Sequence, residues 1–219
     1  MDTEMKQAII FDMDGTLFQT NYILEPALAA TFDHLREQGL WQGTTPIEQY
    51  RAIMGVPLTV VWQTLCPEHD ESQHQESNRY FQQALIEQIE NGTGALYEQV
   101  EETLQQLAAH YPLYIASNGQ MPYLQAIVKQ YGLARWIEGV YSIDTVPSGN
   151  KSELVANIIR ENGITSGFVV GDRASDIKAA QDNGLTAIGV HFDFAQPEEL
   201  QQADFVVKSF AAIVQKIRA

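Results

Sequence analysis

The chain has 219 residues, of which 45% are hydrophobic, and its formal net charge at pH 7 is −15. A chain of this length and apolar content can bury a core as one domain, or as one domain that carries a smaller insert. The strong negative charge repels nucleic acid and anionic membrane surfaces, so it argues against both as partners and favours a small ligand.

Two features bear on where the protein works. Cys66 is the single cysteine and cannot form an internal disulfide, which favours a reducing compartment. The N-terminal segment Met1-Asp2-Thr3-Glu4-Met5 is acidic where a signal peptide would be basic, and no apolar stretch approaches membrane-spanning length. We therefore expect a cytoplasmic protein.

The first predicted element is a short buried strand, Ala8-Ile9-Ile10-Phe11, which is followed directly by Asp12-Met13-Asp14-Gly15-Thr16. Carboxylates at the carboxyl end of a strand lie where open α/β sheets bind ligands. There a carboxylate can coordinate Mg²⁺ and can also attack phosphorus. A plain Asp-Gly turn is the alternative. An EF-hand calcium loop is excluded, because it needs Gly at its sixth position and Glu at its twelfth, where Leu17 and Ile23 stand.

From about Asn21 to Asn91 the sequence shows only helical patterns. One helix is expected to open at Glu25-Pro26 and to end before Gly39. Thr45-Pro46-Ile47-Glu48 has the form of a capping box that starts a second helix, which Met54-Gly55-Val56-Pro57 breaks. Further helical stretches are expected through Val60, Val61 and Leu65 to Pro67, and from Ser72 to Glu90.

From Ala95 onward, helical patterns alternate with short apolar runs, which predicts βαβ units and a parallel sheet. The expected strands are Leu113–Ala116, Val140–Ser142, Phe168–Val170, Ala187–Val190 and Phe205–Val207, with helices near Gln99–Ala109, Tyr123–Tyr131, Glu153–Glu161, Ala174–Asn183 and Phe210–Ile217. The predicted fold is α/β, a Rossmann-like parallel sheet with helices on both faces. Residues 1–19 and 94–219 form this core, and residues 20–93 form an inserted all-helical domain.

Polar residues recur directly after the apolar runs, where a shared site at the carboxyl edge of the sheet would need them. Ser117-Asn118-Gly119 follows one run, and Gly171-Asp172 follows another, with Asp176 close behind. Lys151 stands at the start of a predicted helix, where its ammonium group could neutralise a phosphate. Each piece alone is typical of a turn, a strand exit or a surface lysine, but their joint order favours a phosphate site.

In this set of residues the sequence resembles the haloacid dehalogenase superfamily of aspartate-nucleophile phosphatases, specifically the phosphoglycolate phosphatase-like branch with a helical cap. Asp12-Met13-Asp14-Gly15-Thr16 is similar to the first family motif, and Ser117-Asn118-Gly119 to the second. Lys151 corresponds to the third motif, and Gly171-Asp172 with Asp176 to the fourth. The resemblance implies that the insert at residues 20–93 is a C1 cap, a lid that closes over the substrate.

The resemblance also implies roles for these residues. Asp12 would be the nucleophile and a Mg²⁺ ligand. Asp14 would offer its backbone carbonyl to the metal and its side chain as general acid and base. Asp172 would be the second carboxylate ligand, and Asp176 would hydrogen-bond metal waters or Lys151.

In the same comparison, Ser117 and the Asn118 amide, in the phosphate-binding turn with Gly119, would hold the transferring phosphoryl group. Lys151 would bridge that group and Asp12. Many relatives place Pro after this lysine, whereas Ser152 follows here, and Lys129 is the alternative phosphate lysine.

In the cap, Met54-Gly55-Val56-Pro57-Leu58 resembles the family's specificity loop. Leu58 falls close to where phosphosugar mutase relatives place an arginine, which argues against a mutase. Arg51 could reach the site or could be an ordinary solvated helix residue.

The leading hypothesis is a Mg²⁺-dependent phosphomonoester hydrolase that acts on a small phosphorylated metabolite through an aspartyl-phosphate. Phosphoglycolate, a nucleoside monophosphate, a sugar phosphate and pyrophosphate all remain open as substrates, and the oligomeric state is not indicated. The alternatives are a phosphosugar mutase or other phosphotransferase, a receiver-like signalling module and an inactive binding protein. A phosphonatase would need a cap lysine, which residues 20–93 lack. A dehalogenase would not be expected to retain Asp14 and the full metal-binding set.

Overall fold

The computed structural model describes residues 6–193 and 195–218. Contacts within the chain divide it into two compact units. One comprises the residues up to Gln19 and from Leu96 onward, and the other is Thr20–Ala95. The chain returns from the second unit to the first between Ala95 and Leu96, which is two residues after the boundary expected between residues 93 and 94. All strands in the described ranges belong to the first unit, and the second contains only helices and loops.

The first unit is built on a parallel sheet of six strands in the order β3-β2-β1-β4-β5-β6. Their bounds are β1 Gln7–Phe11, β2 Leu113–Ser117, β3 Ile137–Ser142, β4 Ser166–Gly171, β5 Thr186–Val190 and β6 Phe205–Val207. β1 pairs with β2 on one side and with β4 on the other, so that Phe11 lies opposite both Ile115 and Val170. This register brings the ends of all three strands to one edge of the sheet. The predicted fold class is confirmed.

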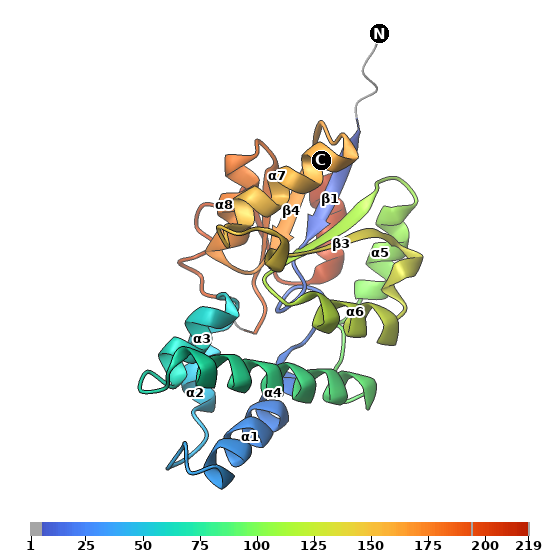
Figure 1. Ribbon diagram of the computed structural model, residues 1–219. Coiled ribbons are helices and arrows are strands. Elements are labelled where there is room, and N and C mark those ends of the chain that lie inside the picture. Colours follow the sequence, from blue (N-terminus) through green and yellow to red (C-terminus); the bar gives the residue numbers. More distant parts are fainter. Residues whose placement is uncertain (1–5, 194, 219) are drawn as a thin grey trace. The chain divides into compact units, whose positions relative to one another are not determined.

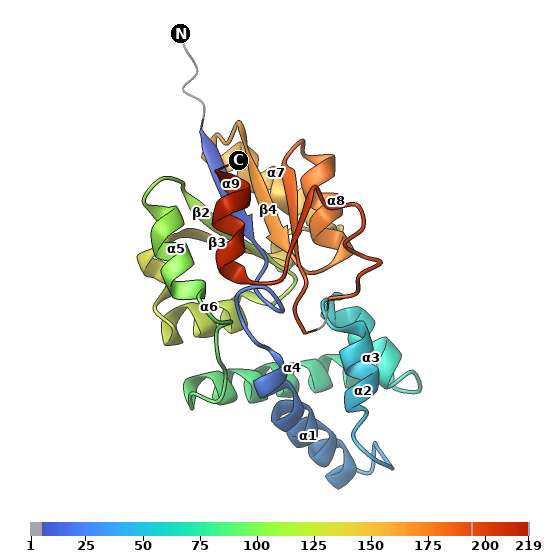
Figure 2. The ribbon, with the colours of Figure 1, turned by 180° about the vertical axis from the view of Figure 1, so that it is seen from behind.

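Helices cover both faces of this sheet. α7 (Lys151–Asn162) and α8 (Ala174–Asp182) pack together on one face, and α5 (Val100–Ala108) and α9 (Ile213–Ile217) lie on the other (Figures 1 and 2). α6 (Met121–Gln130) packs against β3. Short 3-10 helices complete the unit: η1 Leu133–Arg135, η2 Ile143–Thr145 and η3 Phe210–Ala212.

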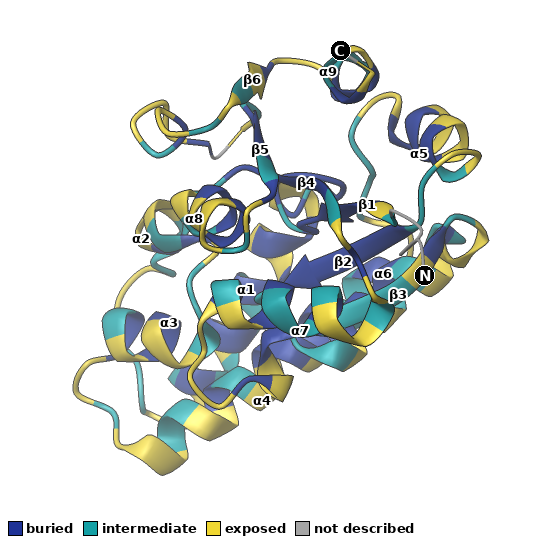
Figure 3. Ribbon diagram, turned by 90° about the horizontal axis from the view of Figure 1, so that it is seen from above, coloured by how far each residue is buried: buried dark blue, intermediate teal, exposed yellow. Residues whose placement is uncertain are grey.

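The central strand is apolar on both faces because both faces are covered. Ile10 belongs to the core cluster that includes Leu154 and Val155 of α7. The Phe11 ring points to the opposite face, where it packs against Phe210 with ring centroids 5.8 Å apart. Figure 3 shows β1 and β2 in the colour of buried residues. A continuous apolar run is therefore the expected sequence of this strand.

The helical unit consists of α1 (Asn21–Glu37), α2 (Ile47–Ile53), α3 (Leu58–Leu65) and α4 (Glu71–Glu90). α1 packs against α4 and buries the apolar face predicted from Leu28, Phe32 and Leu35. The predicted break between α2 and α3 at Met54-Gly55-Val56-Pro57 is also present. In the described ranges, no helix combines the length and the apolar character needed to cross a membrane.

The predicted start of the first helix is wrong. α1 begins at Asn21, four residues before Glu25, and Pro26 lies inside the helix. Pro26 has no N–H to donate to the Tyr22 carbonyl, so the helix loses one internal hydrogen bond. Ile23 and Leu24 are both fully buried. Their burial extends the apolar face by one turn and offsets the loss of that bond.

The predicted capping box at Thr45 and Glu48 is also wrong. Pro46 occupies the N-cap position of α2, so Thr45 stands one residue too early, and its Oγ1 instead accepts a hydrogen bond from Arg36 Nη2 at 3.1 Å. A capping box does form at α4, where the Gln73 N–H donates to Asp70 Oδ1 and the Asp70 N–H donates to Gln73 Oε1, both at 2.9 Å.

Candidate active site

The loop after β1 brings Asp12 and Asp14 to the edge of the sheet. The Asp12 N–H still donates to the Val170 carbonyl of β4 at 2.9 Å, so its side chain starts level with the end of that strand. The chain then turns at Gly15, whose φ is +75°. A Cβ atom on Gly15 would lie 2.4 Å from Asp172 Oδ2. Glycine is therefore needed both for the turn and for the close approach to Asp172.

The end of β4 supplies two more carboxylates. Asp172 directly follows the strand, and Asp176 lies in the first turn of α8, where its Oδ2 accepts a hydrogen bond from the Arg173 N–H at 3.0 Å. A Cβ atom on Gly171 would lie 2.1 Å from Asp176 Cγ, so only glycine lets that carboxylate lie against the strand end. Thr16 Oγ1 donates to Asp172 Oδ1 at 3.5 Å. Both carboxylates are fully or almost fully buried.

Asp12, Asp172 and Asp176 form one buried cluster, in which each offers an oxygen within 4.8 Å of the others. Lys151 is the cation of this cluster. Its Nζ lies 2.8 Å from Asp12 Oδ1 and 2.5 Å from Asp176 Oδ1. When all four groups are ionised, three carboxylates and one ammonium leave a net charge of −2. A divalent cation that prefers oxygen ligands, such as Mg²⁺, fits both this charge and this donor set.

The electrostatics of the cluster favour the uptake of positive charge. Burial raises the pKa of Asp12 to about 7; Lys151 acts to lower it and Asp176 to raise it further. Burial and the charges of Asp12 and Asp176 also raise the pKa of Asp172 well above its usual range. Burial alone would lower the pKa of Lys151, but Asp12 and Asp176 outweigh it and hold that pKa above its usual value. Near neutral pH Asp12 and Asp172 therefore favour binding either a proton or a metal cation.

Lys151 reaches the cluster because it is the first residue of α7. The N-cap residue Asn150 starts the helix, since its Oδ1 accepts a hydrogen bond from the Ser152 N–H at 2.9 Å. Ser152, the residue after this lysine, thus has a defined part in starting this helix. Lys129, the alternative phosphate lysine, is exposed on α6, where it lines a surface pocket with Met121 and Gln125.

The second motif forms a tight turn at the end of β2. Ser117 is the last residue of the strand and is buried, and its Oγ accepts a hydrogen bond from the Gly119 N–H at 3.0 Å. The Gly119 carbonyl accepts one from Ser142 Oγ of β3 at 2.7 Å. Asn118 lies between them in the turn. Because β2 is the neighbour of β1, this turn lies at the same sheet edge as Asp12.

One residue of the site was not predicted from the sequence. The Tyr123 hydroxyl donates a hydrogen bond to Asp14 Oδ1 at 2.5 Å. In the sequence Tyr123 looks like an ordinary core position of α6, since Leu124 and Ile127 beside it are buried. Its place just after Ser117-Asn118-Gly119 is the only sequence signal that could have drawn attention to it.

The sequence model of the haloacid dehalogenase-like hydrolases matches residues 9–190, a span that contains every candidate site residue. The chain belongs to this family. The recognition made from its four motifs is confirmed, and so is the prediction of an enzyme of the phosphatase class.

This haloacid dehalogenase-like hydrolase is 25% identical to the phosphoglycolate phosphatase of Vibrio vulnificus, over 94% of this chain and 93% of that protein. Among solved structures, CbbY from Rhodobacter sphaeroides in complex with phosphate has a TM-score of 0.82 and 20% identity, and covers 98% of this chain and 100% of its own. A predicted phosphoglycolate phosphatase from Haemophilus somnus has a TM-score of 0.81 and 22% identity, over 96% of this chain and 97% of its own. These structures share the fold of the hydrolase.

In the helical unit of the hydrolase, Arg51 is held by neighbours from the same unit. It donates to Asn21 Oδ1 at 3.2 and 3.3 Å, pairs with Glu25 Oε2 at 3.3 Å and makes a second ion pair with Glu48. Two carboxylates offset its charge. Leu58, at the position where mutase relatives were expected to have an arginine, is the first residue of α3.

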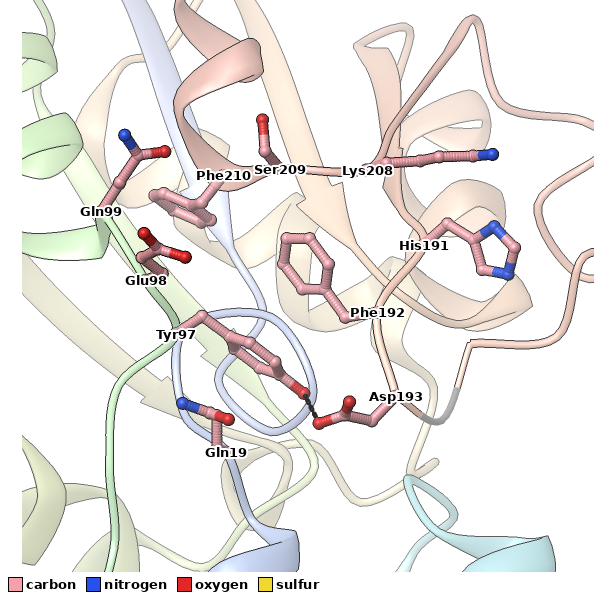
Figure 4. A pocket seen from close by; sticks show the side chains of 10 residues that line it. All are labelled: Gln19, Tyr97, Glu98, Gln99, His191, Phe192, Asp193, Lys208, Ser209 and Phe210. Carbon is pink, nitrogen blue, oxygen red and sulfur yellow. Dashed lines mark hydrogen bonds between the residues drawn. The ribbon is translucent and has the colours of Figure 1, made fainter.

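The first unit of the hydrolase also contains a pocket of about 610 Å³ (Figure 4). Tyr97 and Phe192 pack in it with ring centroids 4.6 Å apart, and the Tyr97 hydroxyl donates to Asp193 Oδ2 at 3.0 Å. Burial, Asp193 and the more distant Asp172 and Asp14 all raise the pKa of Tyr97. None of the motif residues is among those that line the pocket, so the carboxylate cluster is not part of it.

Proposed function

We propose that this hydrolase is a Mg²⁺-dependent phosphomonoester hydrolase that acts on a small phosphorylated metabolite through an aspartyl-phosphate on Asp12. The observation that carries this proposal is the position of Lys151 Nζ between Asp12 and Asp176 within the buried cluster. A lysine that contacts the nucleophile there can also meet the incoming phosphate and offset its charge. The matching family and the phosphatases among the relatives support the same reaction class.

The reaction has two steps. In the first, an Asp12 oxygen attacks phosphorus, the bond from Asp12 to phosphorus forms, and the ester P–O bond breaks while Asp14 gives a proton to the departing oxygen. In the second, a water oxygen attacks phosphorus as Asp14 takes its proton. The bond from Asp12 to phosphorus then breaks, which releases phosphate and restores both carboxyl groups. The proton given in the first step leaves with the alcohol, and the proton taken from water in the second step replaces it on Asp14.

The remaining motif residues bind and orient. Ser117 Oγ and the backbone amide of Asn118, in the turn that Gly119 completes, are assigned to hold the phosphoryl oxygens, and Lys151 is assigned to bridge them and Asp12. The carboxylates of Asp12 and Asp172 and the backbone carbonyl of Asp14 are assigned to Mg²⁺. When bound, the cation offsets the charge of the cluster and polarises the phosphoryl group. Asp176 is assigned to orient Lys151, with which it forms an ion pair.

The substrate choice is assigned to the helical unit, as a C1 cap of about residues 20–93. Its insertion directly after the loop that carries Asp12 and Asp14 supports this role. The name of the Vibrio relative makes phosphoglycolate the first substrate to test. Because Glu25 and Glu48 already offset the charge of Arg51, a second phosphate is disfavoured, and hydrolysis is favoured over a phosphosugar mutase reaction. A cytoplasmic location is part of the same proposal.

A panel of phosphorylated compounds tests the function. Phosphoglycolate, nucleoside monophosphates, sugar phosphates, pyrophosphate and p-nitrophenyl phosphate are each incubated with the purified protein and Mg²⁺. We expect phosphate release that EDTA abolishes and added Mg²⁺ restores, and none from Asp12→Asn. Undiminished release after exhaustive chelation would contradict the metal assignment. If no compound on the panel released phosphate, the proposed hydrolase activity would be contradicted.

A further inference from the structure

Tyr123 joins the acid/base aspartate to the second-motif turn, although it belongs to none of the four motifs. Its hydroxyl donates to Asp14 Oδ1 at 2.5 Å across 109 positions of the chain. The side chain is only 4% exposed. A buried hydroxyl that meets a site carboxylate at this distance restricts how that carboxylate can rotate.

The tyrosine ring is itself held in place by the turn. Tyr123 lies in the first turn of α6, which begins soon after Ser117-Asn118-Gly119. A Cβ atom on Gly119 would lie 3.0 Å from Tyr123 Cδ1, so the absence of a side chain there makes room for the ring. The Gly119 N–H also donates to Ser117 Oγ. The phosphoryl-binding turn and the support of Asp14 are therefore parts of one packed structure.

We propose that Tyr123 is a positioning residue that orients Asp14 for proton transfer; this inference rests on the function proposed above. The hydrogen bond engages Oδ1 and restricts the rotation of the carboxylate, so Asp14 meets its proton-transfer partners in one orientation. The proton must pass between Asp14 and two different oxygens, first that of the leaving group and then that of water. A carboxylate held in one orientation meets both with little further ordering.

Replacing only the hydroxyl separates this role from packing. Tyr123→Phe keeps the ring beside Gly119 and removes the donor to Asp14. The matched control is Tyr114→Phe, because Tyr114 is also a buried tyrosine of the same unit and its hydroxyl donates to Glu138 Oε2, at 3.1 Å. Thermal unfolding of both variants, measured beside wild type, reports any general loss of stability.

The kinetic test uses the full chain with p-nitrophenyl phosphate and Mg²⁺. We expect Tyr123→Phe to lower kcat by roughly tenfold to a hundredfold and to lower KM with it, because a slower second step leaves the first step, and therefore kcat/KM, unchanged. Tyr114→Phe should keep both constants. Since p-nitrophenolate leaves without protonation, the loss should fall on the second step. A larger phosphorylated fraction should then appear in acid-quenched intact-mass spectra of Tyr123→Phe than of wild type.

The double variant decides whether Tyr123 acts through Asp14. When Tyr123→Phe is combined with Asp14→Asn, it should cause no further loss of kcat, because the proton transfer that Tyr123 supports is already lost. Wild-type kcat in Tyr123→Phe, or a full additional loss in the double variant, would overturn the inference and leave the hydrolase proposal intact. Absence of turnover in the wild-type protein would overturn both.

Discussion

Lys151 Nζ lies 2.8 Å from Asp12 Oδ1, although 139 positions separate the two residues in the chain. They meet because β1 occupies the middle of the sheet and α7 begins at the edge where β1 ends. The contact places an ammonium group within the carboxylate cluster. The sequence left open whether Lys151 or Lys129 is the phosphate lysine. A matched pair of variants can test this choice.

Lys151→Met should lower kcat with p-nitrophenyl phosphate by roughly a hundredfold to a thousandfold, as the loss of one group that stabilises a developing oxyanion does. Lys129→Met removes the same charge from an exposed position of α6 and should keep wild-type kcat. Steady-state kinetics with saturating Mg²⁺ measure both. Normal turnover in Lys151→Met together with a loss in Lys129→Met would reverse the assignment.

Much of the sheet and of the carboxylate cluster could be predicted because their signals are local. A buried parallel strand needs a continuous apolar run, and Asp12, Ser117 and Asp172 each stand at the end of such a run. In a parallel sheet these strand ends share one edge, so adjacency in the sequence is enough to place the side chains together.

The features that the sequence did not predict depend on contacts that a local pattern does not show. Pro26 looks like a helix start, but burial of Ile23 and Leu24 extends α1 past it. Thr45 has the residue type for a cap, yet Pro46 shifts the helix start by one position. Tyr123 has the residue type of a core position, and its role follows only from a hydrogen bond to a distant residue.

The raised pKa of Asp12 predicts a pH-dependent effect of Mg²⁺ on stability. The carboxyl group has a pKa of about 7 in the folded protein against 3.8 ordinarily, so its contribution to stability is fully present below about pH 4 and is lost as the pH rises through about 7. Mg²⁺ binds the ionised cluster and competes with its protons. The rise in Tm on adding Mg²⁺ should therefore be larger at about pH 7.5 than at about pH 5.

Thermal unfolding with and without Mg²⁺ at both pH values measures this effect. Asp182→Asn is the control, because Asp182 is a carboxylate outside the cluster that is bonded to Lys178 and Ser152. It should leave the pH dependence of the Mg²⁺ effect unchanged. A Tm rise of equal size at both pH values would show that the carboxyl groups of the cluster do not exchange protons for metal.

Asp172 and Asp176 should differ in how they affect the metal. The Asp176 carboxylate pairs with Lys151 and accepts a hydrogen bond from the Arg173 N–H. Asp176→Ala should therefore weaken the apparent Mg²⁺ affinity by roughly tenfold to a hundredfold, because Lys151 is no longer oriented in the cluster. Asp172→Ala removes a proposed ligand and should depress turnover at every accessible Mg²⁺ concentration. Mg²⁺ titrations of activity measure both variants. If Asp172→Ala used Mg²⁺ as the wild type does, the metal site would be misplaced.

The central claim is that Asp12 becomes phosphorylated and that Asp14 moves the protons. With p-nitrophenyl phosphate, the first step needs little help from Asp14, whereas the second loses its base in Asp14→Asn. Loss of that base should slow dephosphorylation by roughly a hundredfold to ten-thousandfold. The phosphorylated protein should therefore accumulate in Asp14→Asn and should not form in Asp12→Asn.

Intact-mass spectrometry of these two variants, quenched in acid after mixing with p-nitrophenyl phosphate and Mg²⁺, tests this claim most directly. The account predicts one added phosphoryl group on Asp14→Asn that hydroxylamine removes, and none on Asp12→Asn. An adduct that persists in Asp12→Asn, or that maps to Ser117, would contradict it.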